Sequence, residues 1–244
     1  MSALAAAPAA PGHAAIQAQR WFDLETRTYE SHAYECHNGG AGETLTLGSP
    51  GPVGLCLTSV HAVNHWAALD GTPKVADRGT GSLVEVLATS AHIRGRVITR
   101  KAKSHAHMLD AVARLARECS SGGQLVVDIH GMKDSRDLDG EFGFGFTPGE
   151  AEIAAAEVLG SMMCARGLRV AYNERHPAKY VTNVVNRVRA AGGQSFQLEI
   201  AARARPPVGD PARAQALLDA LQEFAGWCLT HAAAVISSPD SGGV

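Results

Sequence analysis

The chain has 244 residues, of which 45% are hydrophobic, and its 22 basic and 24 acidic side chains give a net charge of −2. This length and apolar content suffice for the buried core of one α/β domain. The balanced charge excludes a strong electrostatic attraction to nucleic acid or to an anionic membrane, so we expect neither as a partner.

The two ends of the chain differ in composition from its middle. Residues 1–18 are rich in Ala and Pro, and residues 236–244 are rich in Ser and Gly, so we expect both to be disordered around a single domain at residues 19–235. The start lacks a basic segment typical of signal peptides, and no apolar run reaches the roughly 18 residues of a membrane span. The sequence therefore predicts a cytoplasmic protein, and it leaves the oligomeric state open.

The five cysteines have no paired spacing, which argues against a zinc ribbon or a disulfide framework and for a reducing compartment. Cys56, Cys119, Cys164 and Cys228 lie in apolar runs or on apolar faces. We expect these four to be small core residues, while the environment of Cys36 stays open.

The first half of the chain predicts two strands and two helices. Residues 53–58 are typical of a buried strand, residues 80–88 of a helix capped by Thr80, and residues 124–129 of a central parallel strand. The helix expected at residues 104–119 places one apolar face toward the core, formed by Met108, Ala111, Val112, Leu115, Ala116 and Cys119.

The second half continues the alternation. Thr147 is the expected cap of a helix that runs to about residue 166, and strands are expected at residues 168–172 and 194–201. Asp210 and Pro211 open a last helix, whose apolar face is formed by Leu217, Leu221, Phe224, Ala225 and Cys228. Strands that alternate with helices predict an α/β fold of three layers, α/β/α, around a mostly parallel central sheet.

Three predicted strands end in side chains that can bind metal or catalyse a reaction. His61 follows the strand at residues 53–58, His130 follows the strand at residues 124–129, and Glu199 lies near the end of the strand at residues 194–201. Ligands of open α/β sheets collect at the carboxyl ends of the strands. We therefore expect these three side chains to meet in one site.

Two histidines and a carboxylate can hold one Zn²⁺ and leave a position for water, whose pKa falls to about 7. A further carboxylate can take the proton of that water and pass it to the leaving nitrogen of an amide. His61 and His130 suit the first role, and Glu199 the second. The spacing does not by itself require this, because eleven histidines make a strand-end histidine common by chance. In the alternative without a metal site, Glu199 would form a salt bridge to Arg203 or Arg205.

Five short segments add to this pattern, in the order Ser59-Val60-His61-Ala62, Asp128-Ile129-His130-Gly131, Glu141-Phe142-Gly143-Phe144-Gly145, residues 168–175 with Tyr180-Val181-Thr182, and residues 195–201 with Gln197-Leu198-Glu199-Ile200. Together they resemble the N-formylglutamate amidohydrolase family over roughly residues 50–205. The resemblance implies a zinc-carboxypeptidase-like (phosphorylase/hydrolase-like) fold and hydrolysis of an amide bond next to an acidic group. It implies one zinc ion on His61 and His130, with Glu199 as the general base.

The resemblance also implies a third ligand. Asp77 lies where the family has an acidic residue ahead of a helix. Val60 stands where the family usually has Pro, and the turn after His61 differs from the family's glycine-containing turn. His65, which ends this turn, is therefore an alternative ligand or a neighbour that supports the site.

Several arginines are candidates for binding a substrate carboxylate. Arg175 matches the family's Asn-x-Arg turn, and a guanidinium binds a carboxylate through two parallel hydrogen bonds. Arg96, Arg100 and Arg136 are further candidates, with a solvated surface charge as the alternative for each. The family's Asp-x-Asn-Arg pattern is absent from residues 94–104, so we expect an N-acyl amino acid or peptide other than formylglutamate.

Two other functions fit the sequence. A binding or regulatory protein that kept the fold and lost the chemistry would explain the altered turn after His61. A hydrolase without metal would use Cys36 or Cys56 as a nucleophile together with a histidine.

Overall fold

The computed structural model describes residues 11–37, 43–48, 54–67, 70–89, 93–120, 124–134 and 137–236. Its main sheet has seven strands in the order β1-β5-β2-β6-β9-β7-β8, and a second sheet pairs β3 with β4. The strands are β1 (Thr44–Leu47), β2 (Leu55–Ser59), β3 (His65–Trp66), β4 (Pro73–Lys74), β5 (Ile93–Ile98), β6 (Leu125–Met132), β7 (Gly140–Gly143), β8 (Val170–Tyr172) and β9 (Gln194–Ala201).

The centre of the main sheet is parallel. β5, β2, β6 and β9 run in one direction, whereas β1 is antiparallel to β5 and β7 is antiparallel to β9. Every residue of β2 is buried, as expected for a strand that helices cover on both faces. The mostly parallel sheet predicted from the sequence is confirmed.

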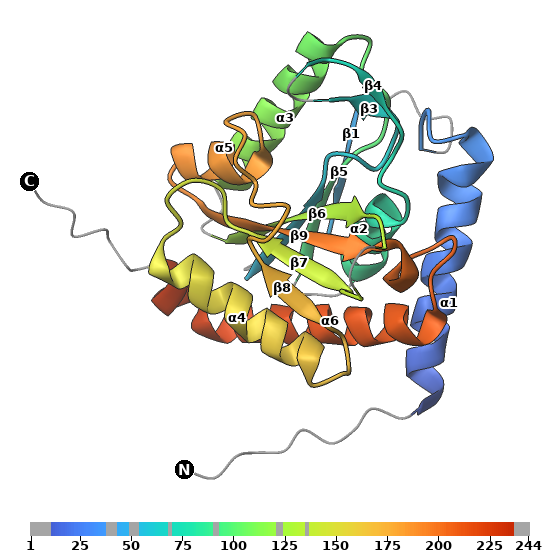
Figure 1. The fold of residues 1–244 in the computed structure, drawn as a ribbon, viewed down its shortest axis with the longest axis vertical. Helices are drawn as coiled ribbons and strands as arrows, with labels where there is room; N and C mark the ends of the chain where they lie inside the picture. Colours follow the sequence, from blue (N-terminus) through green and yellow to red (C-terminus); the bar gives the residue numbers. More distant parts are fainter. Residues whose placement is uncertain are drawn as a thin grey trace, which may run out of the picture.

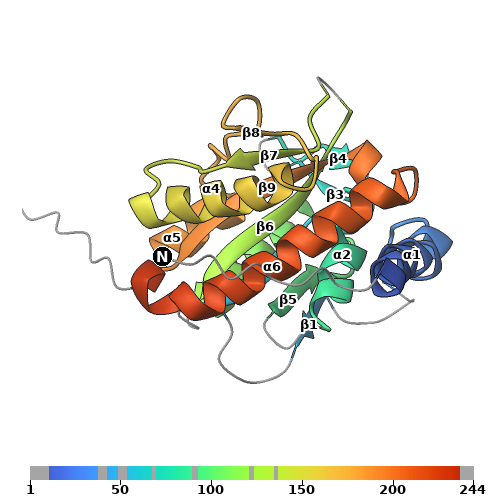
Figure 2. The same cartoon turned by 90° about the horizontal axis from the view of Figure 1, so that it is seen from below.

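Helices cover both faces of this sheet (Figures 1 and 2). They are α1 (Pro11–Thr28), α2 (Thr80–Leu87), α3 (His105–Ser120), α4 (Glu150–Cys164), α5 (Val184–Ala190) and α6 (Pro211–Ile236), with short 3-10 turns at Glu30–His32 and Ala202–Ala204. α3 and α5 pack together on one face, α2, α4 and α6 pack on the other, and α1 lies outside α2 and α6. The three-layer α/β/α architecture is thus confirmed. Within the described ranges, no helix has the length and apolarity needed to cross a bilayer.

Most expected elements are present, with shifted ends. β9 has the expected bounds, and the expected apolar face of α3 is buried. α4 is capped by Gly149 rather than Thr147, because the Glu152 carboxylate accepts the backbone N–H of Gly149 at 2.8 Å. α2 follows Gly79, so Thr80 is its first residue rather than its cap. β1, β5, β7 and α5 were not predicted from the sequence.

The N-terminal boundary differs from the expectation of disorder up to residue 18. α1 begins at Pro11, and its buried residues Ala18, Trp21 and Glu25 lie at helical spacing. Proline is tolerated in the first turn of a helix and alanine favours the rest, so this composition supports a helix once it can pack. At the other end α6 extends to Ile236, one residue beyond the expected boundary, and residues 1–10 and 237–244 lie outside the described residues.

α1 fixes the turn that carries Asp77. The indole N–H of Trp21 donates to the carbonyl of Gly79 at 2.9 Å, and the backbone N–H of Gly79 donates to the buried Glu25 carboxylate at 2.7 Å. Gly79 has a φ of 83°, a left-handed conformation that favours glycine. The Thr80 hydroxyl donates to the carbonyl of Asp77 at 2.7 Å. The N-terminal helix therefore contributes to the candidate site at a distance.

Candidate metal centre

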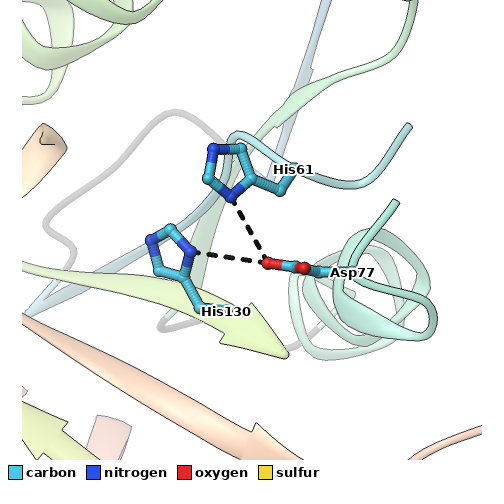
Figure 3. A group of neighbouring side chains, drawn as sticks. All are labelled: His61, Asp77 and His130. Atoms are coloured by element: carbon cyan, nitrogen blue, oxygen red, sulfur yellow. Dashed lines mark ion pairs between the residues drawn. The ribbon is translucent and has the colours of Figure 1, made fainter. Parts of the chain in front are cut away.

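Three candidate ligands converge at the carboxyl ends of β2 and β6. His61 lies two residues beyond β2, His130 lies within β6, and Asp77 lies in the turn before α2. One carboxylate oxygen of Asp77 lies 3.4 Å from Nδ1 of His61 and 3.5 Å from Nδ1 of His130. Figure 3 shows both rings directed toward this carboxylate. The structure therefore brings together the three residues that the sequence selected as ligands.

The three side chains influence one another's charge. Burial would raise the pKa of Asp77, but the imidazoles of His130 and His61 hold this pKa well below its usual value. Burial would lower the pKa of His130, but the carboxylates of Asp128 and Asp77 raise it well above its usual value. The Asp77 carboxylate is thus held as an anion in contact with both imidazoles.

Asp128 orients His130. Its carboxylate lies 2.7 Å from Nε2 of the His130 ring, and it also accepts a hydrogen bond from the Thr58 hydroxyl at 2.6 Å. With Nε2 bound in this way, Nδ1 of His130 is the nitrogen that faces Asp77. Metal-binding histidines almost always have such a carboxylate or carbonyl on the other ring nitrogen.

The donor set fits a divalent cation. One ligand atom each from His61, Asp77 and His130 can be chosen so that all lie within 4.8 Å of one another. Two imidazole nitrogens and one carboxylate oxygen are the ligand types of catalytic zinc sites. The carboxylate support of His130 is a second observation, independent of the distances, in favour of this fit.

Glu199 lies beside this group. It pairs in register with His130 across β6 and β9, so the two side chains project from the same face of the sheet. Its side chain is buried, and its carboxylate accepts a hydrogen bond from the Gln197 amide at 3.3 Å. Burial raises the pKa of Glu199, and the imidazoles of His130, His176 and His61 oppose this shift only in part. A raised pKa suits a group that takes up a proton.

Among the described residues, neither Arg203 nor Arg205 forms a salt bridge with Glu199. Arg203 pairs with Asp137 and Asp139, both at 3.0 Å. Arg205 donates instead to backbone carbonyls, those of Arg78, Ile200 and Met132.

His65, the alternative ligand, stacks on His61. The two ring centroids lie 3.8 Å apart and the rings are nearly parallel, at 6°. Burial and the neighbouring His61 lower the pKa of His65 to about 3. Its Nδ1 lies 3.3 Å from the carbonyl of Val63. This arrangement favours a role for His65 in holding the His61 ring in place.

The candidate arginines that the structure describes differ in their surroundings. Arg175 is exposed, and its backbone N–H donates to Glu141. Arg100 is also exposed and lines a pocket with Lys101, Lys103 and His107, which contains none of the three candidate metal ligands. Arg96 pairs with Glu118 at 3.2 Å, and its side chain is only 19% exposed. Arg136 lies outside the described residues.

The sequence reasoning missed a second carboxylate–histidine pair. Glu141 of β7 is paired with Glu199 in register, and its carboxylate lies 2.9 Å from Nδ1 of His176. Burial would raise the pKa of Glu141, but hydrogen bonds from the backbone of His176 and Arg175 and from the His176 ring lower it. The sequence signal for this pair is the carboxylate of Glu141, which directly precedes the apolar segment Phe142-Gly143-Phe144.

The fold is similar to solved structures at low sequence identity. N-formylglutamate amidohydrolase from Ralstonia eutropha JMP134 matches with a TM-score of 0.53 and 13% identity over 76% of this chain and 98% of that one. A bacteriophage poly-gamma-glutamate hydrolase matches with a TM-score of 0.50 and 16% identity over 78% of this chain and 91% of that one. The gene product Atu2144 from Agrobacterium tumefaciens matches with a TM-score of 0.52 and 13% identity over 78% and 96%.

These likenesses show the fold, since at such identities one fold serves many functions. Comparison of the sequence with protein-family models and with curated proteins finds no match.

Proposed function

We propose that this chain is a zinc-dependent amidohydrolase that cleaves the amide bond of an N-acyl amino acid or a peptide bearing a carboxylate. The observation that carries the proposal is the group His61, Asp77 and His130, with the buried Glu199 in register beside His130. Two of the solved structures with this fold are named as hydrolases of glutamate derivatives, which supports the same chemistry here.

Each residue of the group has a proposed role. His61, Asp77 and His130 would hold one Zn²⁺, and Asp128 would fix the His130 ring for this purpose. When bound, the ion would polarise the scissile carbonyl and lower the pKa of a water molecule. Glu199 takes the proton from the attacking water, for which its raised pKa suits it.

The exposed side chain of Arg175 is the candidate partner for the carboxylate of the substrate. Arg100 lines a separate pocket, so we assign it no part in orienting the scissile bond.

The test is hydrolysis of a panel of acidic substrates by the zinc-loaded protein. The panel contains N-formyl-, N-acetyl- and N-succinyl-L-glutamate, N-acetyl-L-aspartate and poly-γ-glutamate, and the release of free amine or carboxylate is measured. We expect hydrolysis of at least one member that stops on chelation and returns with Zn²⁺. Binding of a panel member without turnover, by a protein that takes up no metal, would instead favour a binding protein on this fold.

A further inference from the structure

His176 is hydrogen-bonded to side chains of two strands, β7 and β9. Glu141 of β7 accepts hydrogen bonds from the backbone N–H groups of Arg175 at 2.6 Å and of His176 at 2.8 Å. The other Glu141 oxygen lies 2.9 Å from Nδ1 of the His176 ring. Gln197 of β9 donates to the carbonyl of His176 at 2.7 Å. The loop after β8 is thus tied to the strand that carries Glu199.

The ring of His176 is available to a bound molecule. Its side chain is 35% exposed, whereas that of Glu141 is 1% exposed. Because Nδ1 is bonded to Glu141, Nε2 is the ring nitrogen that can meet a substrate. A carboxylate that fixes one ring nitrogen and leaves the other for chemistry is the arrangement found in many acid–base sites.

His176 and the candidate metal ligands lie on opposite sides of Glu199. His130, Glu199 and Glu141 form one row across β6, β9 and β7, so their side chains project from the same face. The amide of Gln197 links the two sides, since it donates to both Glu199 and the carbonyl of His176. An amide whose carbonyl oxygen points toward His130 can place its nitrogen on the side of Glu141 and His176.

From this geometry we infer that His176 is a second catalytic residue, which donates the proton of Nε2–H to the leaving nitrogen while Glu141 positions its ring. The inference rests on the proposed function. The attacking water forms the new C–O bond and gives its proton to Glu199, and the C–N bond breaks as the nitrogen takes the proton from His176. Transfer of the Glu199 proton to solvent and uptake of one by His176 restore the starting state.

The test compares two leaving groups on one acyl group. The first substrate is the amide that wild type cleaves best in the panel described above. The second is the ester of the same acyl group with 3-carboxy-4-nitrophenol, which keeps a carboxylate and whose phenolate departs without a proton. His176→Asn is the main variant, because its amide can still donate to Glu141, and His176→Gln is the second in case the first does not fold.

We expect His176→Asn to lower kcat on the amide at least about 100-fold, the range of general acid catalysis, and on the ester by less than about fivefold. KM, zinc content and the thermal unfolding temperature should match those of wild type. Glu141→Gln should likewise lower kcat more on the amide than on the ester, with a smaller loss than His176→Asn. His231→Asn, at an exposed position of α6, is the matched control and should leave both rates unchanged.

Three results would overturn the inference. Equal losses on the amide and the ester would show that His176 supports the structure or the charge on oxygen. An unchanged kcat, or a change confined to KM, would remove His176 from the chemistry and leave the hydrolase assignment standing. A wild type that binds no zinc and cleaves neither substrate would refute the proposed function, and the inference would fall with it.

Discussion

Asp128 and His130 form a carboxylate–imidazole pair within one strand, with 2.7 Å between the carboxylate oxygen and Nε2. Alternate residues of a strand project from the same face, so the two-residue spacing places the carboxylate beside the ring. The pair leaves Nδ1 of His130 facing Asp77, 3.5 Å away. The Asp-x-His motif at the end of a central strand thereby gives an oriented candidate metal ligand.

Asp128→Asn should weaken zinc binding without removing the ligands. Loss of the carboxylate behind a metal-binding histidine typically costs 10- to 100-fold in affinity, which sets the size we expect. The measurement is competition with a fluorescent zinc chelator. Asp110→Asn, on the exposed side of α3, is the matched control. An affinity equal to that of wild type would show that Asp128 does not support the metal site.

Glu199→Gln should abolish turnover and leave the metal in place. The amide keeps the size of the side chain but cannot take a proton, so kcat should fall at least about 100-fold. Zinc content should stay that of wild type, because Glu199 is not among the candidate ligands. Glu157→Gln, on the exposed face of α4, is the control. Near-normal turnover in Glu199→Gln would contradict the role of Glu199 as the base.

The parts of the site that could be predicted from the sequence are those whose signal lies in neighbouring residues of the chain. His61, His130 and Glu199 were identifiable because each follows or ends an apolar run, and parallel strands bring such ends together. The bounds of β9 and the buried face of α3 followed from local periodicity in the same way. Each of these features can be predicted from the residues that directly precede and follow it in the chain.

Other parts of the site depend on packing between distant segments. β5 alternates buried Ile93, Gly95 and Val97 with half-buried Arg94 and Arg96, so its sequence also fits a basic surface segment. β7 has four residues and gives almost no periodic signal. Glu141 lies in β7, which pairs with β9. The contact between Glu141 and His176 depends on this pairing and could not be predicted from the sequence.

The stability of the protein should depend on pH through Glu25. Burial raises the pKa of Glu25 above its usual value, although hydrogen bonds from Ser82 and Gly79 oppose the shift. The folded state therefore holds this proton more tightly than the unfolded state. The resulting stability is fully present below about pH 4.5 and is lost as pH rises through the folded pKa.

Glu25→Gln removes this dependence and keeps an acceptor for Gly79. The free energy of unfolding of the variant should therefore improve relative to wild type between pH 5 and pH 7, with a slope of at most about 1.4 kcal/mol per pH unit. Urea unfolding of the metal-free proteins at several pH values measures this difference. A difference that does not change with pH, or that favours wild type as pH rises, would contradict the assignment.

The cysteines should differ in reactivity. Cys164, expected from the sequence in the core, is exposed near the end of α4, whereas Cys56, Cys119 and Cys228 are buried. Burial raises the pKa of Cys228 to about 12. Iodoacetamide at pH 8 should therefore modify Cys164 first and spare the three buried thiols in the folded protein.

Peptide mass spectrometry after timed alkylation measures this order, and Cys164→Ser should remove the fast reaction. Hydrolysis should be unchanged after modification of Cys164. Loss of hydrolysis in step with modification of Cys36 would support a cysteine nucleophile and count against the metal mechanism.

The most direct test of the central claim is the metal content of the purified chain by elemental mass spectrometry, with His61→Ala, His130→Ala and the exposed control His107→Ala beside it. We predict about one zinc per chain in wild type and in His107→Ala, and loss of the metal in the other two variants with circular dichroism unchanged. Wild type without stoichiometric metal after zinc reconstitution, or full metal content in His61→Ala and His130→Ala, would contradict the account.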